Sequence, residues 1–387
     1  MKRIHSIDVT RGFVMIIMAL DHVRDYLHVN SITQNPVNLD TTTPALFFTR
    51  WITHICAPTF VFLAGTSAFI SYKKNDDAGK TRKFLLTRGA WLILLEFTLM
   101  NLILWFDVKY RTLIFEVIGT IGFGFIILSF LLKLSWKTIG IIGICITVLH
   151  GLLPLIPVSD GSIIKRILSA LFSPGALILK PDFMFIMTYP QIPWLGIMLA
   201  GFAAGKLFEY ESSKRKKIFL QFGLASLILY VVIRFINIYG DPVPWSQQKK
   251  SVYTFLSFMN ISKYPPSLVF CLATLGITSV LLSISERFNH KTTKLISIFG
   301  SVPLFYFMLH LFVIHTIMLA MVFIQGYHWN DLLFTNFNLG RPTGKSGVSL
   351  KWIYVIWICV VVTMYPLCKW YSNYKSMHKE KQWLRYF

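Results

Sequence analysis

The chain has 387 residues, of which 55% are hydrophobic and only 14% are charged, and its mean hydropathy is +0.58. Soluble domains carry about a quarter charged residues, so this composition excludes an ordinary soluble enzyme. Many apolar stretches of about twenty residues instead predict a polytopic helical membrane protein. The net charge of +21 is expected to come from basic membrane loops, so it does not indicate a nucleic-acid partner.

The hydrophobic pattern predicts an all-α bundle of about ten transmembrane helices. They cover approximately residues 12–29, 45–71, 84–106, 112–132, 136–156, 187–208, 218–239, 264–285, 298–324 and 351–371. A further apolar piece, residues 167–179, is broken by Pro174 and Gly175 and would add a re-entrant or interfacial segment. No soluble appendage is evident, so residues 1–387 are predicted to form one membrane domain.

Basic residues set the predicted orientation. If the N-terminus is cytoplasmic, the cytoplasmic segments hold about twice as many Lys and Arg residues as the outside loops. Ten spans then place the C-terminus in the cytoplasm as well. The longer outside loops, 30–44, 157–186, 240–263 and 325–350, are rich in Asn, Thr, Ser, Pro and aromatic residues.

The first span carries an unusual group of charges in its outer half. Asp21, His22, Arg24, Asp25 and His28 follow a wholly apolar run. Each ionisable group costs about 2.5–3.5 kcal/mol inside a membrane, so this half is expected to face protein or water. Asp25 lies three residues from both histidines and so can orient either imidazole. The pattern predicts acid–base chemistry at His22 or His28.

Two other interpretations of this group remain open. An ion pair of Arg24 with Asp21 or Asp25 would only lock helices together. His22, Asp25 and His28 would alternatively bind a metal, but their side chains spread over about 120° of the helix and no cysteine accompanies them. No metal is therefore expected.

Polar residues elsewhere are expected to complete a cavity that opens to the outside. Arg50 and His54 are one turn apart at the start of the second span, and His310 lies in the ninth. Arg11 precedes His22 by eleven residues, which is about 16 Å of rise and about three turns. Both side chains thus face the same way at two depths, as a ligand lying along the helix requires.

The chain resembles a known family over nearly its whole length. The segment "RIHSIDVTRGFVMIIMALDH" is similar to the first helix of the membrane acyltransferases related to heparan-α-glucosaminide N-acetyltransferase. The segments "YPQIPWLGIMLAGFAAGKLF", "KYPPSLVFCLATLG", "GSVPLFYFMLHLFVIH", "CKWY" and "WLRYF" look like its bacterial members. The spacing from Arg11 to His22 is also similar to a pattern of bacterial membrane O-acyltransferases in the wider superfamily.

The resemblance implies transfer of an acetyl or other acyl group from cytoplasmic acyl-CoA, with acetyl-CoA as the expected donor. The acceptor would be an extracytoplasmic glycan or lipid-linked sugar of the cell envelope, and the enzyme would lie in the plasma membrane. In this family a histidine on the non-cytoplasmic side is catalytic, which leaves His22 and His28 as candidates.

The other predicted site residues take supporting roles in such a reaction. Asp25 would stabilise the imidazolium, and Arg11 would bind a CoA phosphate. Arg50, His54 and His310 would contact the thioester oxygen or the acceptor.

A proton-coupled transporter or exporter is the alternative function, because chains of Asp and His inside a membrane are typical of pumps. Binding of acyl-CoA distinguishes the two classes. In either case the lipid bilayer surrounds the chain, and the sequence leaves open whether several copies associate.

Overall fold

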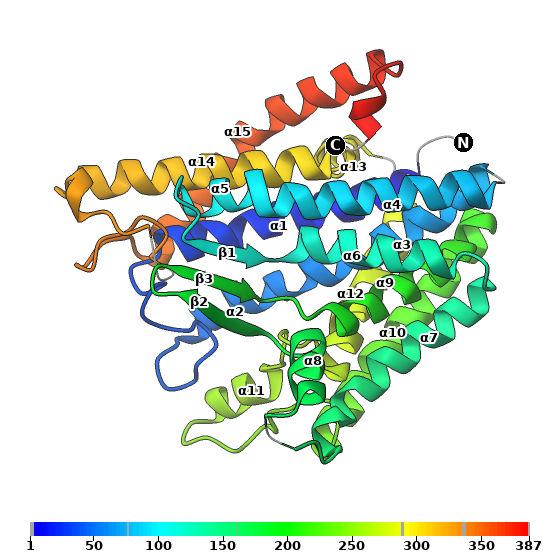
Figure 1. The fold of residues 1–387 in the computed structure, drawn as a ribbon, viewed down its shortest axis with the longest axis horizontal. Helices are drawn as coiled ribbons and strands as arrows, with labels where there is room; N and C mark the ends of the chain where they lie inside the picture. The colour runs from blue at the N-terminus through cyan, green and yellow to red at the C-terminus, as the bar shows by residue number, and fades with distance from the viewer. Residues whose placement is uncertain (1–3, 76, 160, 288–289, 335–337, 386–387) are drawn as a thin grey trace.

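The computed structural model of the protein describes residues 4–75, 77–159, 161–287, 290–334 and 338–385. Helices make up most of it (Figure 1). The α-helices are α1 (His5–Leu27), α2 (Pro44–Trp51), α3 (Cys56–Asn75), α4 (Ala78–Leu95), α5 (Asn101–Trp105), α6 (Val117–Leu131), α7 (Trp136–Leu149), α8 (Ile163–Phe172), α9 (Gln191–Ala204), α10 (Ser212–Ile236), α11 (Ser251–Met259), α12 (Leu268–Arg287), α13 (Lys291–Ser301), α14 (Pro303–Ile324) and α15 (Leu350–Met377).

Short helical turns join or extend several of these helices. They are η1 (Ile52–Ile55), the π-helical turn η2 (Glu96–Met100), η3 (His150–Leu155), η4 (Gly205–Glu209), η5 (Trp329–Asp331) and η6 (Gln382–Arg385). Because η1 and η2 connect helices without a break in direction, Pro44–Lys74 and Ala78–Trp105 each form one long helical segment.

Each predicted span overlaps a helix or consecutive helices. Within the described residues, eight helical segments are long and apolar enough to cross a membrane. The other two predicted spans correspond to α1, which carries several charged residues, and to α6, which has 15 residues. The chain is therefore a multi-pass helical protein, while the number of ten spans and the sides of the termini stay predictions.

A small sheet corrects the expectation of a wholly helical chain. Strand β3 (Phe183–Met187) pairs in parallel with β1 (Thr112–Phe115) and antiparallel with β2 (Gly175–Lys180), in the order β1-β3-β2. The first strand lies inside the segment predicted as the fourth span. Three of its four residues are apolar, and they resemble the start of a membrane helix, since a short apolar run fits either structure.

The apolar piece 167–179 forms the end of α8 and most of β2. None of the described residues of α8 is buried, and β2 is exposed along its whole length. Re-entrant backbone must be buried in protein or line an aqueous cavity. This exposure therefore favours the interfacial alternative for the segment.

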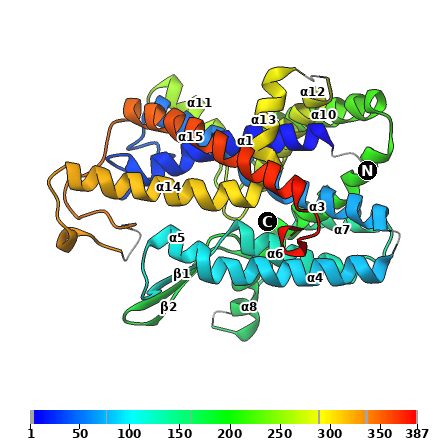
Figure 2. The ribbon, with the colours of Figure 1, turned by 90° about the horizontal axis from the view of Figure 1, so that it is seen from above.

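Helix α1 lies at the centre of the bundle. It packs against α3, α12, α13, α14 and α15, and Figures 1 and 2 show these helices around it. The approach to α13 is closest at Gly12 and Gly300, where a Cβ atom on either residue would overlap the backbone of the opposite helix. Small residues at such crossings let helix backbones meet in membranes.

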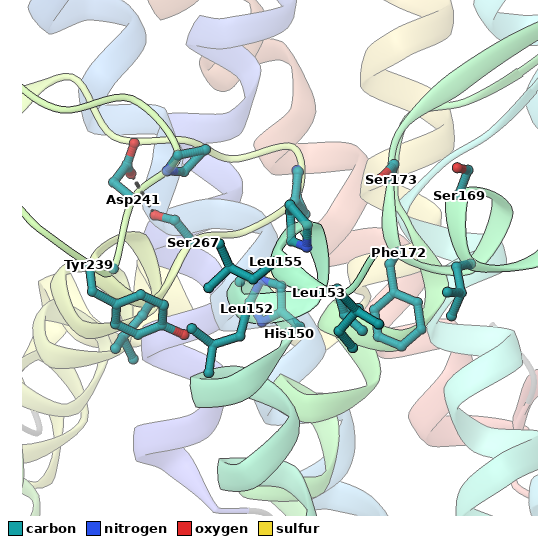
Figure 3. Close-up of a pocket in the computed structure, with 18 of the residues that line it drawn as sticks. His150, Leu152, Leu153, Leu155, Ser169, Phe172, Ser173, Tyr239, Asp241 and Ser267 are labelled. Atoms are coloured by element: carbon teal, nitrogen blue, oxygen red, sulfur yellow. Dashed lines mark hydrogen bonds between the residues drawn. The ribbon is translucent and has the colours of Figure 1, made fainter. Parts of the chain in front are cut away.

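The loop between α10 and α12 is built around one carboxylate. Asp241 Oδ2 accepts hydrogen bonds from the backbone N–H of Ser262 at 2.9 Å and from the hydroxyl of Ser267 at 2.7 Å, as Figure 3 shows for Ser267. These bonds hold the turn that begins at Lys263 against the C-terminal end of α10. Residues of this turn line two cavities.

A second carboxylate organises the turn between α5 and β1. Asp107 accepts hydrogen bonds from the Arg111 side chain at 2.9 and 3.2 Å and from two backbone N–H groups. Partial burial acts to raise the pKa of Asp107, but the bonds from Arg111 outweigh it and keep that pKa below its usual value. The turn directs the chain into β1 and from there into α6.

Replacing Asp107 by Asn is expected to lower the melting temperature of the purified protein at pH 7 by a few degrees, since charge-assisted hydrogen bonds are lost. Because the pKa of Asp107 is lower in the folded protein, its carboxylate stabilises the fold at pH values above the unfolded-state pKa of about 3.9. This stabilisation is lost as the pH falls through the folded-state pKa. The difference in melting temperature between the wild-type protein and the variant should therefore shrink only below about pH 3.9 and vanish below the lowered folded-state pKa. Differential scanning fluorimetry measures this, with Asp40→Asn, at an exposed residue, as the control. Equal melting at pH 7 would contradict the role of Asp107.

Candidate active site

Four charged side chains from α1 and α2 form a continuous chain of ion pairs. Arg24 Nη2 lies 2.7 Å from a carboxylate oxygen of Asp21 and 2.7 Å from one of Asp25. The other oxygen of Asp21 lies 2.7 Å from Arg50 Nη1. The ion pair considered from the sequence is therefore present, and it extends to the second helical segment.

This chain forms part of the wall of a small cavity of about 100 Å³, which we call the histidine cavity. Polar residues from the start of α6 and from the segments before α9 and α12 also line this cavity. Its lining is Met18, Asp21, His22, Asp25, Arg50, Thr53, Cys56, Ala57, Phe60, Glu116, Val117, Tyr189, Lys263, Tyr264 and Phe307.

His22 presents its imidazole to this cavity. The ring lies 5.2 Å from the ring of His310 and 6.2 Å from that of Phe307. Its nitrogen atoms form no hydrogen bond with any residue that the structure describes. A ligand in the cavity would therefore find this imidazole available for proton transfer.

Sequence reasoning missed four polar residues of the cavity. Lys263 lies over the rings of Tyr264 at 4.9 Å and Tyr189 at 5.5 Å, and Glu116 lines the same space. The segments that contain Tyr189 and Lys263 are rich in proline and look like ordinary helix starts. Glu116 carries no recognisable signal. Only the packing of distant segments brings the four residues to His22.

Polar residues of the third predicted span position Glu116. The carboxylate of Glu96 accepts hydrogen bonds from the backbone N–H groups of Glu116 at 2.8 Å and Gly119 at 3.1 Å, so it caps the N-terminus of α6. Asn101 exchanges hydrogen bonds with the backbone of Ile114 at 2.7 and 3.0 Å. These two buried side chains hold β1 and α6 so that Glu116 faces the cavity.

A second cavity, of about 340 Å³, lies between α1, α3, α4, α6 and α14, and we call it the arginine cavity. Arg11 lines it and donates hydrogen bonds to the hydroxyl of Ser67 at 2.6 Å and the carbonyl of Leu63 at 3.1 Å. Arg88 lines it from α4. Apart from these arginines and Ser67 and Ser71, the lining is apolar.

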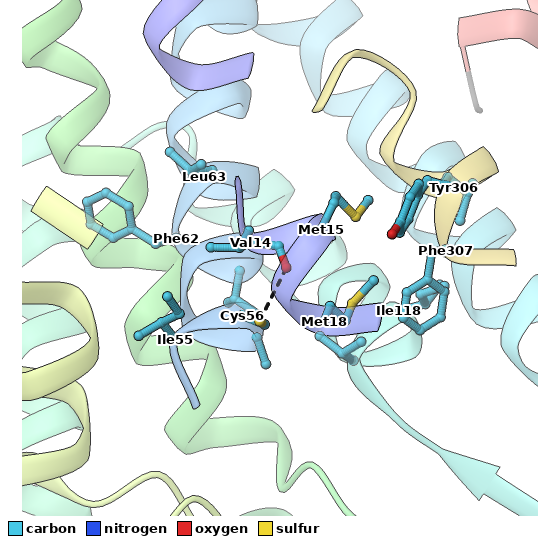
Figure 4. Close-up of a cluster of buried hydrophobic side chains, with 14 of the residues drawn as sticks. Val14, Met15, Met18, Ile55, Cys56, Phe62, Leu63, Ile118, Tyr306 and Phe307 are labelled. Carbon is cyan, nitrogen blue, oxygen red and sulfur yellow. Dashed lines mark hydrogen bonds between the residues drawn. The ribbon is translucent and has the colours of Figure 1, made fainter. Parts of the chain in front are cut away.

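The two cavities meet at three residues. Phe60, Val117 and Phe307 line both of them. Figure 4 shows Phe307 beside Met15 and Met18 of α1 and Ile118 of α6 in this apolar region. The expected placement of Arg11 and His22 along one side of α1 thus corresponds to two adjoining cavities, separated by apolar side chains.

Other predicted site residues lie outside both linings. His54 is buried against the ring of Phe270, with centroids 5.5 Å apart. His310 is fully buried behind His22, where its Nδ1 donates to the carbonyl of Tyr306 at 2.8 Å. Neither residue reaches the cavity directly, which corrects the expectation that both would line it.

His28 also lies apart from the cavity. Its backbone carbonyl accepts from the Arg341 side chain at 2.8 Å, and its Nδ1 accepts from the N–H of Asn30 at 3.3 Å. Asp25 contacts Arg24, and the expected hydrogen bond from Asp25 to His22 or His28 does not form. For His28 the reason is that α1 ends at Leu27, so this residue leaves the helical face.

Over the described ranges, no group of three or more His, Cys, Asp or Glu side chains is placed to hold a metal ion.

The fold and the cavities define a class: a multi-pass membrane protein with a charged cavity joined to an apolar, arginine-bearing one. The profile of the family described as heparan-alpha-glucosaminide N-acetyltransferase, catalytic, matches residues 3–235. The chain belongs to this family, and a membrane acyltransferase type of function follows. A search of curated proteins finds no match. The matched region includes α1 through most of α10 and therefore both Arg11 and His22.

Replacing Asp21 by Ala is expected to reduce the free energy of unfolding by about 3–5 kcal/mol, because two buried guanidinium groups lose their shared carboxylate. Removing Arg50 as well should restore part of this loss, so the double variant Asp21→Ala/Arg50→Ala should lose at least about 1 kcal/mol less than the sum of the single variants. Unfolding in mild detergent measures the cycle. Strict additivity would show that the two side chains do not interact.

Proposed function

We propose that the protein transfers an acetyl or other acyl group from cytoplasmic acyl-CoA, across the membrane, to an acceptor on the other side. The observation that carries the proposal is the junction of the two cavities at Phe60, Val117 and Phe307. A donor in the arginine cavity would bring its reacting end to the histidine cavity.

The arginine cavity has the chemistry that an acyl-CoA donor requires. Phosphates of CoA would bind Arg11 and Arg88, because guanidinium groups form strong charge-assisted hydrogen bonds with phosphate oxygens. The apolar lining between these residues and Phe307 would take the pantetheine arm. In the predicted orientation, this cavity lies towards the cytoplasm, where acyl-CoA is available.

The histidine cavity would then hold the reacting groups. His22 would take the proton of an acceptor hydroxyl or amine while that oxygen or nitrogen bonds to the thioester carbonyl carbon. The carbon–sulfur bond would then break, and the imidazolium would return the proton to the CoA thiolate. Transient acylation of His22 itself would produce the same products.

Charged neighbours of His22 would stabilise these states. Lys263 and Arg50 line the same cavity, and their positive charges would favour the negative charge that develops on the thioester oxygen. Asp25 and Asp21 would favour the imidazolium. His310, behind His22, would act as a positioning residue for its ring.

The acceptor and the location of the enzyme are part of the same proposal. The acceptor would be a glycan or lipid-linked sugar of the cell envelope, and the enzyme would lie in the plasma membrane with both termini in the cytoplasm. These statements are supported by the family, by the distribution of basic residues and by the polar loops predicted outside.

Acetyl-CoA at 100 times its Kd is expected to stabilise the purified protein by about 2.7 kcal/mol. Arg11→Gln and Arg88→Gln should each weaken this binding about ten-fold, since each removes a charge-assisted contact to phosphate. Thermal shift titration measures the effect, and Lys83→Gln, at an exposed residue of α4, is the matched control. Absence of a thermal shift with acetyl-CoA and longer acyl-CoAs, together with proton-dependent solute uptake in liposomes, would favour the transporter instead.

His22→Ala is expected to reduce acyl transfer by about 100-fold or more, which is the usual contribution of a general base. His28→Ala should keep most of the activity, because His28 lies outside the cavity. The measurement is transfer of radiolabelled acetyl from acetyl-CoA to an envelope glycan fraction by each variant in vesicles. Full activity of His22→Ala would contradict the assignment.

A further inference from the structure

A third cavity lies at the outer ends of α7 and α10, and at about 520 Å³ it is larger than the other two (Figure 3). We call it the leucine cavity. Its walls come from η3, α8, the turn after α10 and the start of α12. Leu152, Leu153, Leu155, Leu168 and Phe172 provide much of the surface. Its volume is typical of cavities that bind small organic ligands.

The polar groups of this cavity are largely engaged within the protein. Asp241 accepts hydrogen bonds from Ser262 and Ser267. The hydroxyl of Tyr239 donates to the carbonyl of Val148, and Nδ1 of His150 donates to that of Ile146 at 3.0 Å. A ligand in this space would therefore meet mainly hydrocarbon, which suits an aliphatic chain better than a free sugar.

Helix α8 and strand β2, which flank the cavity-lining residue Ser173, have surfaces suited to a membrane interface. Ile163, Ile164 and Ile167 of α8 are 67%, 60% and 52% exposed, and Ile178 of β2 is 77% exposed. Lys165 and Arg166 lie on the same short helix. A helix with exposed apolar residues and basic neighbours is typical of segments that lie in the plane of the membrane interface. The cavity is thus placed where an aliphatic chain can enter from the bilayer.

One turn joins this cavity to the candidate active site. Lys263 and Tyr264 line the histidine cavity, whereas Pro265 and Ser267 line the leucine cavity. A molecule that passes over this turn would have its two ends in different surroundings. One end would lie among hydrocarbon, and the other would lie beside His22 and Lys263.

We propose that the leucine cavity binds the hydrocarbon chain of a lipid-linked sugar acceptor, whose hydroxyl- or amine-bearing head group enters the histidine cavity. The inference rests on the proposed acyl transfer and names its acceptor class. The apolar wall, the exposed helix α8 and the turn from Lys263 to Ser267 together favour an acceptor that carries its own chain over a soluble glycan.

Photo-crosslinking tests the site without requiring activity. The full chain in lipid nanodiscs is labelled with hexadecyl β-glucosaminide that carries a diazirine on its alkyl chain. Label is expected on peptides from η3 and α8. Excess hexadecyl β-glucosaminide should remove most of it, whereas the same excess of phosphatidylglycerol should not. Equal displacement by both would show an ordinary bilayer-lipid site and overturn the proposal.

Two variants of α8 provide a matched pair. Leu168→Trp places a large side chain in the cavity, while Ile167→Trp changes the neighbouring residue, which is not part of the lining. Specific labelling of Leu168→Trp should be at least five-fold lower than that of the wild-type protein, whereas specific labelling of Ile167→Trp should equal it. Equal labelling of both variants, or no specific labelling of the wild-type protein, would overturn the proposal.

Kinetics separate this proposal from the proposed function. With acetyl-CoA as donor, Leu168→Trp should raise KM for hexadecyl β-glucosaminide at least five-fold and leave transfer to methyl β-glucosaminide unchanged. An equal loss with both acceptors would overturn the acceptor assignment. If the wild-type protein acetylates neither acceptor but shows the specific labelling, the chain-binding site stands and acyl transfer to these sugars fails.

Discussion

The chain of charges from Asp25 through Arg24 and Asp21 to Arg50, which is largely buried except at Asp25, is the constraint on which the rest of the structure depends. Its charges cannot face lipid without a large cost, and each needs a partner of opposite sign. The protein provides these partners by packing α1 against the helical segment that starts at α2. Helix α1 is accordingly the central helix, enclosed by α3 and α12 to α15.

The same constraint explains the division between the cavities. Near the charges, the protein brings further polar groups together, and Glu116 and Lys263 share the histidine cavity with the ion pairs. One to two turns away along α1, the environment becomes apolar, and Met15 and Phe307 line the arginine cavity. An apolar junction between two charged regions limits the passage of water between them.

Much of the fold was predictable, because hydrophobic spans, basic loops and helical spacing are local properties of the chain. Helical geometry placed Arg11 and His22 along one side of α1, and each lines one of the two adjoining cavities. Helical geometry could not show that His54 and His310 are covered by neighbouring rings, or that His28 leaves the helix. Strand β1 was missed since its short, mostly apolar sequence fits a strand as well as a helix.

By itself the sequence determined that this is a helical membrane protein with costly charges in its first span, and its motifs identified the family. Tertiary structure decided which polar residues meet. Tyr189 and Lys263 reach His22 only through the packing of α9 and α12, and Glu116 only because Glu96 caps α6. Sequence periodicity indicates which residues share one face of a helix. A cavity depends on contacts between segments far apart in the chain, and no local sequence pattern predicts those contacts.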